Sequence, residues 1–176
     1  MLTITRLCAQ DLYPHRTCLR ELLFDAVENG ASVGFLFDLD EAHASRYFDQ
    51  VQAAMQEGEQ QVWLALENGQ VVGSVQLNLC RKPNGLNRAE VQKLLVHSKA
   101  RRRGIARELM QCLELEAKEL KRGLLYLDTE AGSEAESFYR TLGYTHAGNL
   151  PDYACSPDGT YRATAIYYKT LSKAQP

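Results

Sequence analysis

A strand that leads into a basic, glycine-containing turn and then a helix is the feature that most constrains this chain. The strand ends in Leu94, Leu95 and Val96, and the helix begins on the run Arg-Arg-Arg-Gly-Ile-Ala. A helix N-terminus offers unpaired N–H groups and a partial positive charge. Arginine cations are unfavourable beside that positive charge, which suggests that an anion binds there. We therefore interpret the turn as a pyrophosphate-binding site. The residues expected to hold the anion are Arg101, Arg102, Arg103, Gly104, Ile105, Ala106 and Arg107.

The turn differs from the better-known nucleotide-binding motifs. No Gly-Lys-Ser/Thr follows it, which excludes a Walker A loop, and G-x-G-x-x-G is absent, which excludes a Rossmann fingerprint. Gly104 has no side chain to keep an anion away from the backbone, and Ala106 has the next smallest side chain. The alternative interpretation is a solvated, arginine-rich helix start without a ligand.

The spacing of apolar residues in the rest of the chain predicts a mixed α/β fold. Helices are predicted over 11–29, from 38 or 40 to 57, from about 103 to 123, and from 133 to 143. Strands are predicted over 3–7, 61–66, 71–79, 88–96, 124–128, from 144, and over 165–170. The order β-α-α-β-β-β-α-β-α-β-β corresponds to a central sheet of about seven strands flanked by about four helices.

Several short signals mark where these elements begin and end. Asn68-Gly69 between two alternating strands predicts a tight hairpin. Ser-Glu-Ala-Glu at 133–136 has the pattern of a helix capping box. The stretch 149–162 is polar and contains proline and glycine, so we expect a loop there.

Composition bounds the class of protein. Hydrophobic residues make up 45% and charged residues 24% of the 176 residues, and no linker divides them, so 1–176 are expected to form a single domain. The net charge of −2 argues against nucleic-acid binding. No apolar run is long enough to span a membrane, and the start of the chain does not resemble a signal peptide, which favours a cytoplasmic protein.

Cysteine and histidine are dispersed along the chain. The five cysteines form no C-x-x-C pair, and the four histidines form no H-E-x-x-H motif. We expect reduced thiols and no metal site.

Two motifs resemble those of the GNAT acetyltransferases. Arg101-x-x-Gly104-x-Ala106 after an L-x-V strand end matches the family's Q/R-x-x-G-x-G/A motif, and 138–144 resemble its F-Y-x-x-L-G-F/Y helix ending. The order of elements from 3 to 170 also agrees. The resemblance implies the GNAT fold, with a mixed, mostly antiparallel sheet, and an N-acetyltransferase that uses acetyl-CoA as co-substrate.

Three longer segments, 30–35, 82–94 and 127–132, are similar to the tabtoxin-resistance group of this family, which acetylates a β-lactam amino acid toxin. This similarity implies a small, amino-acid-like or antibiotic-like amine as acceptor and a role in toxin or antibiotic resistance. One position departs from the family pattern. Many members carry Asn three residues before the helix alanine, where this chain has Gly132.

The resemblance also implies roles for individual residues. The backbone of Leu94, Leu95 and Val96 would pair with the pantetheine arm of acetyl-CoA, and the amides of 102–107 would bind its pyrophosphate. Tyr139 would be the general acid that protonates the departing thiolate. The alternative for Tyr139 is a core aromatic residue with no part in the chemistry.

Asp128 is the candidate general base, with Glu130 as the alternative carboxylate. We expect Asp128 to end a buried strand, where a free carboxylate is costly unless a cationic substrate pairs with it. Its other interpretation is a loop-bracing residue. The loops 31–37 and 149–162 are expected to enclose the acceptor, with contacts from Phe35, Glu130, Tyr153 and Arg162.

Two other functions stay open at this stage. A protein or peptide N-acetyltransferase would need an open groove, and a CoA-binding regulatory module would have lost its catalytic groups. The presence of both Asp128 and Tyr139 argues against the regulatory module. The sequence also leaves open whether two copies associate as a homodimer.

Overall fold

A computed structural model describes residues 1–171, and within these residues the chain forms one seven-stranded sheet and four α-helices in the predicted order. The helices are α1 (Leu12–Glu28), α2 (Glu41–Gln56), α3 (Ile105–Glu119) and α4 (Glu134–Thr141). The strands are β1 (Leu2–Arg6), β2 (Gln60–Glu67), β3 (Gln70–Leu79), β4 (Arg88–Val96), β5 (Leu124–Glu130), β6 (Thr145–Cys155) and β7 (Tyr161–Thr170).

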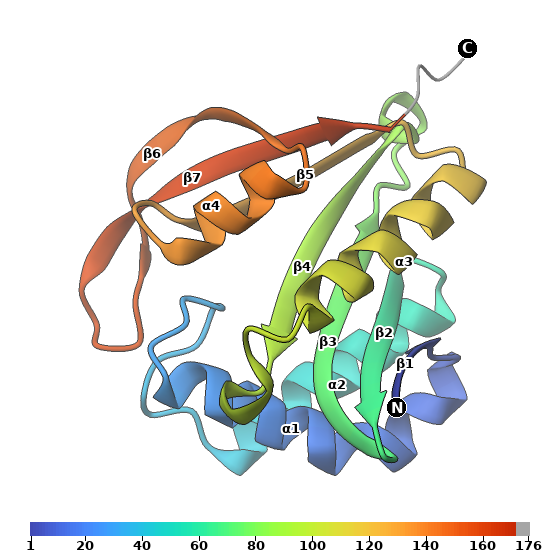
Figure 1. Cartoon of the computed structure of the whole chain (residues 1–176), viewed down its shortest axis with the longest axis vertical. Helices are drawn as coiled ribbons and strands as arrows, with labels where there is room; N and C mark the ends of the chain where they lie inside the picture. The colour runs from blue at the N-terminus through green and yellow to red at the C-terminus, as the bar shows by residue number, and fades with distance from the viewer. Residues whose placement is uncertain (172–176) are drawn as a thin grey trace.

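The sheet has the order β1-β2-β3-β4-β5-β7-β6. The pair β4–β5 is parallel and the other neighbours are antiparallel, which confirms the mixed, mostly antiparallel sheet. Figure 1 shows α1 and α2 on one face of the sheet and α3 on the other. Each face therefore has its own hydrophobic core.

Strand β3 shows how both faces are covered. Val75 and Leu77 are fully buried in the core beneath α3. Ser74 and Gln76 point to the opposite face and are also buried, because α1 and α2 cover it. The amide oxygen of Gln76 accepts a hydrogen bond of 2.9 Å from the Tyr47 hydroxyl, so its burial does not leave it unpaired.

The local signals for turns and caps are mostly confirmed. Asn68 and Gly69 both adopt positive φ, 51° and 79°, as a tight hairpin turn requires. Asp40, rather than Asp38, caps α2 by accepting a hydrogen bond of 2.7 Å from the His43 amide. The end of α3 differs from the prediction. Lys121 takes the left-handed conformation, with φ of 57°, so the helix ends before Gly123.

The predicted loop 149–162 is wrong for most of its length. Strand β6 continues to Cys155 and pairs with β7, which leaves only residues 156–160 as the turn. The pairing of β6 with β7 is irregular at residues 146–148 and 150–154. Gly148 and Pro151, which obscure the strand pattern in the sequence, lie in these two irregular segments. An edge strand tolerates such bulges because one of its sides has no partner.

Helix α3 offers a matched test of this packing. Leu109 is fully buried against the sheet, whereas Leu115 on the same helix is 62% exposed. Leu109→Ala should lower the free energy of unfolding by about 2–5 kcal/mol, because it leaves a cavity in the core. Leu115→Ala should change it by less than about 0.5 kcal/mol. Urea denaturation of both variants measures the difference, and equal losses would contradict the packing described here.

Candidate active site

The site begins where β4 and β5 separate. The two strands pair only over residues 88–90 and 124–126, and then diverge, as Figure 1 shows. Beyond Glu90, β4 has no strand partner on its β5 side within residues 1–171. The divergence leaves an unpaired backbone edge facing an opening in the sheet, and such an edge can pair with an extended ligand.

A β-bulge shapes the β4 side of this opening. Gln92 and Leu95 pair with Gln76 and Ser74, so two residues of β4 lie opposite one residue of β3. Lys93 within the bulge has a φ of 49°. A bulge of this kind redirects side chains relative to the regular alternation of a strand.

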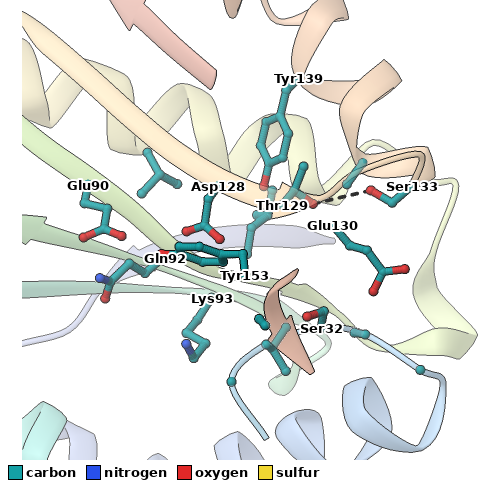
Figure 2. Close-up of a pocket in the computed structure, with 18 residues that line it drawn as sticks. Ser32, Glu90, Gln92, Lys93, Asp128, Thr129, Glu130, Ser133, Tyr139 and Tyr153 are labelled. Carbon is teal, nitrogen blue, oxygen red and sulfur yellow. Dashed lines mark hydrogen bonds between the residues drawn. The ribbon is translucent and has the colours of Figure 1, made fainter. Parts of the chain in front are cut away.

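A central cavity of about 430 Å³ occupies the opening (Figure 2). Its walls come from the loop at 30–34, from 90–94 of β4, from 128–130 of β5, from Tyr139 of α4, and from 153–154 of β6. The structure thus brings together five residues that the sequence analysis selected: Leu94, Asp128, Glu130, Tyr139 and Tyr153.

A second cavity of about 400 Å³ lies over the basic turn. It is bounded by Val96, by residues 100–102 and 104–107 at the start of α3, and by Glu134, Ala135 and Phe138 of α4. Ala135 lines both cavities, so the second cavity adjoins the central one beside the N-terminal end of α4.

The backbone of the basic turn is arranged as an anion site requires. Arg102 and Gly104 both have positive φ, 63° and 82°, and Gly104 is the N-cap of α3. The Glu108 amide is the first to bond within the helix, to the Gly104 carbonyl at 3.2 Å. Within residues 1–171, the amides of 101–107 have no protein partner. They remain available to a ligand.

The arginine side chains do not all point into this cavity. Arg101 donates to the Val96 carbonyl at 3.2 Å, and Arg102 pairs with Glu134 at 2.6 Å. Arg103 instead pairs with Glu67 at the end of β2 and does not line the cavity. The ion pair draws its side chain away, which leaves only its backbone for an anion.

The side chain of Leu95 faces the core, whereas the side chain of Arg107 faces the second cavity. Leu95 is buried in the core on the α1 and α2 face, so only its backbone is at the β4 edge. Arg107 lines the second cavity and donates to the Thr141 hydroxyl at 3.1 Å, which ties the start of α3 to the end of α4.

Tyr139 packs in the core as an aromatic residue and also lines the central cavity. Its ring is buried beside Tyr144 and Tyr167, with ring centroids 5.8 Å and 6.3 Å away, and its hydroxyl points toward β5 and the central cavity (Figure 2). Burial raises the pKa of the Tyr139 phenol, and the nearby charge of Asp128 raises it further. The phenol therefore keeps its proton at neutral pH.

Asp128 is exposed, so the expectation that it ends a buried strand is wrong. Strand β5 runs on to Glu130, and the opening beside β4 leaves the Asp128 carboxylate in contact with solvent. The Thr164 hydroxyl lies 3.1 Å from this carboxylate and 2.9 Å from the Thr129 carbonyl, so the two oxygens share its one proton. What makes Asp128 a candidate is its position in the cavity, rather than a cost of burial.

Glu130 is engaged by other protein groups. It accepts a hydrogen bond of 2.6 Å from the Ser156 hydroxyl and lies 3.6 Å from the guanidinium of Arg162. Asp128 has no cationic partner within 4 Å in residues 1–171. Of the two carboxylates, Asp128 is therefore the freer to interact with a substrate.

Two residues selected as acceptor contacts lie outside the central cavity. Phe35 packs against Tyr47 at a ring distance of 5.3 Å and lines a separate groove beside α2. Arg162 pairs with Glu130 and Asp158. Tyr153 does line the central cavity and is 53% exposed.

Glu90, Gln92 and Lys93 also line the central cavity from β4, and the sequence pattern did not select them. The available signal is the adjacent polar pair Gln92-Lys93, which breaks the alternation of the strand. Single polar positions such as Glu90 give no signal, because polar positions in an alternating strand usually face solvent.

The predicted capping box at the start of α4 is wrong about the hydrogen bonds, although Ser133 is the N-cap residue. The Ser133 side chain makes no capping bond and lies 3.4 Å from the Thr129 hydroxyl. The Glu136 carboxylate accepts instead from the Gly132 amide at 2.7 Å and from the Tyr167 hydroxyl. Glu136 thus links the loop before α4 to β7 and fixes the helix that carries Tyr139.

The described residues contain neither a metal-binding cluster nor a membrane-spanning helix. Within residues 1–171, no three His, Cys, Asp or Glu side chains are grouped so that they could hold a metal ion. In the same part of the chain, no helix has the length and apolar character needed to cross a membrane.

Comparison with known proteins supports one family. The family described as the acetyltransferase (GNAT) domain matches residues 23–151. An N-acetyltransferase from Staphylococcus aureus Mu50 has a TM-score of 0.80 and 22% identity, with 98% of this chain and 99% of that chain covered.

Two further solved structures have the same overall shape. A ribosomal-protein-alanine N-acetyltransferase from Brucella melitensis has a TM-score of 0.80 and 24% identity, covering 96% of this chain and 99% of its own. A Salmonella typhimurium protein solved with its cofactor acetyl-CoA has a TM-score of 0.79 and 18% identity, covering 99% and 96%. At these identities the likeness shows a shared fold.

Glu136 should make the stability of the site depend on pH. The bonds from Tyr167 and Gly132 hold the pKa of the Glu136 carboxyl below its ordinary value of 4.5. Its stabilising contribution is therefore complete above about pH 4.5 and is lost as the pH falls through the folded-state pKa. Glu136→Gln should cost about 1 kcal/mol at pH 7 and less at pH 3. Melting curves at both pH values measure this, and a loss that does not shrink at pH 3 would contradict it.

Proposed function

The chain belongs to the acetyltransferase (GNAT) family, whose members take an acetyl group from acetyl-CoA, and we propose that this one transfers it to the amine of a small molecule. The observation that carries the proposal is the pair of adjoining cavities at the divergence of β4 and β5. One cavity offers unpaired amides and arginines, and the other offers carboxylates and a phenol. A phosphate-bearing donor and an amine acceptor need these two environments.

The residues present fit acetyl-CoA as co-substrate. The amides of 101–107, the helix N-terminus and the side chains of Arg101, Arg102 and Arg107 suit its pyrophosphate. The unpaired edge of β4 suits the amide-containing pantetheine arm, since an extended chain can add to an open sheet edge. Gly132 lacks the side chain that many family members have before the helix, so it contributes no side-chain contact.

The acceptor amine would attack the thioester carbon directly. A new C–N bond forms as the C–S bond breaks, and the acceptor ammonium loses two protons overall, one to the sulfur and one to solvent. Asp128 would orient the ammonium and accept a proton from it, and Tyr139 would donate to the departing sulfur. The raised pKa of Tyr139 leaves this proton in place until the thiolate develops.

A small, amino-acid-like or antibiotic-like acceptor is the finer part of the proposal. The segments 30–35, 82–94 and 127–132, which resemble the tabtoxin-resistance group, contribute much of the wall of the central cavity. Tyr153 adds to the wall from β6, and a single cavity lined from several elements favours a small acceptor over a peptide. A role in toxin or antibiotic resistance follows if such a compound is the natural acceptor.

Binding of acetyl-CoA at the basic turn can be tested at Gly104. Gly104→Asp adds a negative charge where the pyrophosphate would bind, and like charges in contact cost several kcal/mol, so affinity should fall by roughly 10²-fold or more. Calorimetric titration with acetyl-CoA measures the loss. Gly104→Asn is the matched control, because Asn has nearly the same shape and also tolerates the φ of 82°. Equal affinities of the Asp and Asn variants would refute the pyrophosphate assignment.

The role of Tyr139 can be tested by removing its hydroxyl alone. Tyr139→Phe keeps the ring and its packing, and within residues 1–171 this hydroxyl has no hydrogen-bond partner to lose. If Tyr139 donates a proton to the sulfur, turnover should fall by about 10²–10⁴-fold while the melting temperature changes little. Thiol release with an amine panel and thermal melting give the two readouts.

Tyr144→Phe is the control for this experiment. Tyr144 is buried beside Tyr139 but lines neither cavity, so its loss of a hydroxyl should leave turnover unchanged. A stable and fully active Tyr139→Phe variant would end the general-acid assignment. A wild-type protein that binds acetyl-CoA without turnover on any amine would favour the regulatory module instead.

A further inference from the structure

Lys93 is the one cationic side chain among the residues that line the central cavity, and the chemistry proposed above gives it no role. It lies on β4, on the wall opposite β5, beside the loop at 30–34. Its ammonium is within reach of Gly34, where an added Cβ would lie 3.7 Å from the lysine nitrogen.

The β-bulge is the reason that Lys93 reaches this wall. In a regular strand, neighbouring residues point to opposite faces, and Val91 points toward the α3 side. Lys93 would point the same way, but its φ of 49° and the extra residue in the bulge turn it toward α2. A strained backbone angle in a lysine is uncommon and indicates that the surrounding structure imposes it.

The aromatic ring of Tyr47 supports the Lys93 ammonium. The nitrogen lies 5.7 Å from the ring centroid, which is a cation–π distance. The Tyr47 hydroxyl donates to Gln76 at 2.9 Å, and Gln76 also accepts from Gln60 at 2.9 Å. This buried chain of hydrogen bonds holds the ring in place, so the position of the ammonium is defined.

Within residues 1–171, Lys93 has no carboxylate within 4 Å. Burial lowers the pKa of the Lys93 ammonium, and the more distant charges of Asp128 and Glu90 oppose that shift. Glu130, the other acidic residue in the wall, is paired with Arg162. The lining of the cavity therefore includes a partly buried cation and two carboxylates, Asp128 and Glu90, that have no ionic partner within residues 1–171.

We propose that Lys93 binds a carboxylate of the acceptor, so that the substrates of this enzyme are amino acids. This inference rests on the proposed acetyltransferase function and specifies its acceptor. An amino acid carries an ammonium and a carboxylate on one small molecule, which complements carboxylates and a cation held apart in one cavity. The acceptor carboxylate pairs with the Lys93 ammonium. The acceptor amine then lies on the Asp128 side of the cavity, where it takes up the acetyl group.

A charge-assisted hydrogen bond in a partly desolvated cavity gives this contact its strength. The bond also orients the acceptor, because an amino acid anchored at Lys93 cannot place its amine far from β5. A neutral amine lacks the anchor and leaves the lysine without a partner. The expected discrimination is therefore by the presence of the carboxylate.

The experiment compares each primary-amine amino acid of proteins with its carboxamide as acceptor, using thiol release from acetyl-CoA. The wild-type protein should show a higher kcat/KM for at least one acid than for its carboxamide, by about 10–100-fold. Lys93→Met removes the charge and keeps a long, flexible chain at the strained position. It should abolish that preference, chiefly by raising KM for the acid, with kcat much less affected.

Lys118→Met is the matched control, since Lys118 is exposed near the end of α3, away from both cavities. It should keep the wild-type preference. Circular dichroism and acetyl-CoA titration of the Lys93→Met variant establish that it is folded and still binds the donor. A fall in kcat for acids and carboxamides alike would indicate that Lys93 acts in proton transfer, and would overturn the inference.

Other outcomes are equally decisive. A wild-type protein that acetylates carboxamides or simple amines as well as acids refutes the inference and leaves the acetyltransferase function standing. Failure to acetylate any amino acid while acetyl-CoA still binds refutes the acceptor class alone. Failure to bind acetyl-CoA refutes the proposed function, and the inference falls with it.

Discussion

The separation of β4 from β5 is the constraint on which the rest of the site depends. These are the parallel neighbours in the sheet, and their pairing stops after residues 88–90 of β4. If the ladder continued, the β4 edge would be paired and the central cavity would be filled by backbone. Because it stops, one strand edge is left for a ligand, and α4 is positioned at the opening with Ala135 lining both cavities.

The polar side chains of the site are positioned by contacts between helices and strands. Glu136 links the start of α4 to Tyr167 on β7, which sets the direction of Tyr139. Thr164 on β7 supports Asp128, and the bulge in β4 directs Lys93. The proposed donor site lies on a helix start and the proposed acceptor site lies on strand ends, so neither depends on a flexible loop alone.

Several local predictions are wrong because the final contacts of a residue are not those that its local pattern favours. Arg103 has the same sequence setting as its neighbours, yet Glu67 draws it away from the second cavity. Ser133 fits a capping pattern, but the Glu136 carboxylate is used by Gly132 and Tyr167. The length of β6 was hidden because bulges on an edge strand break the alternation by which strands are recognised.

The sequence by itself determined the order of helices and strands, the hairpin at Asn68, the basic turn at Gly104 and the family, because these depend on local spacing and on short motifs. Only the tertiary structure decided that Asp128 is exposed and that Asp128 and Lys93 both line the central cavity. The physical reason is that exposure and charge contact depend on where the sheet opens and where it bulges. Those features arise from pairing between residues far apart in the chain, which a linear pattern does not encode.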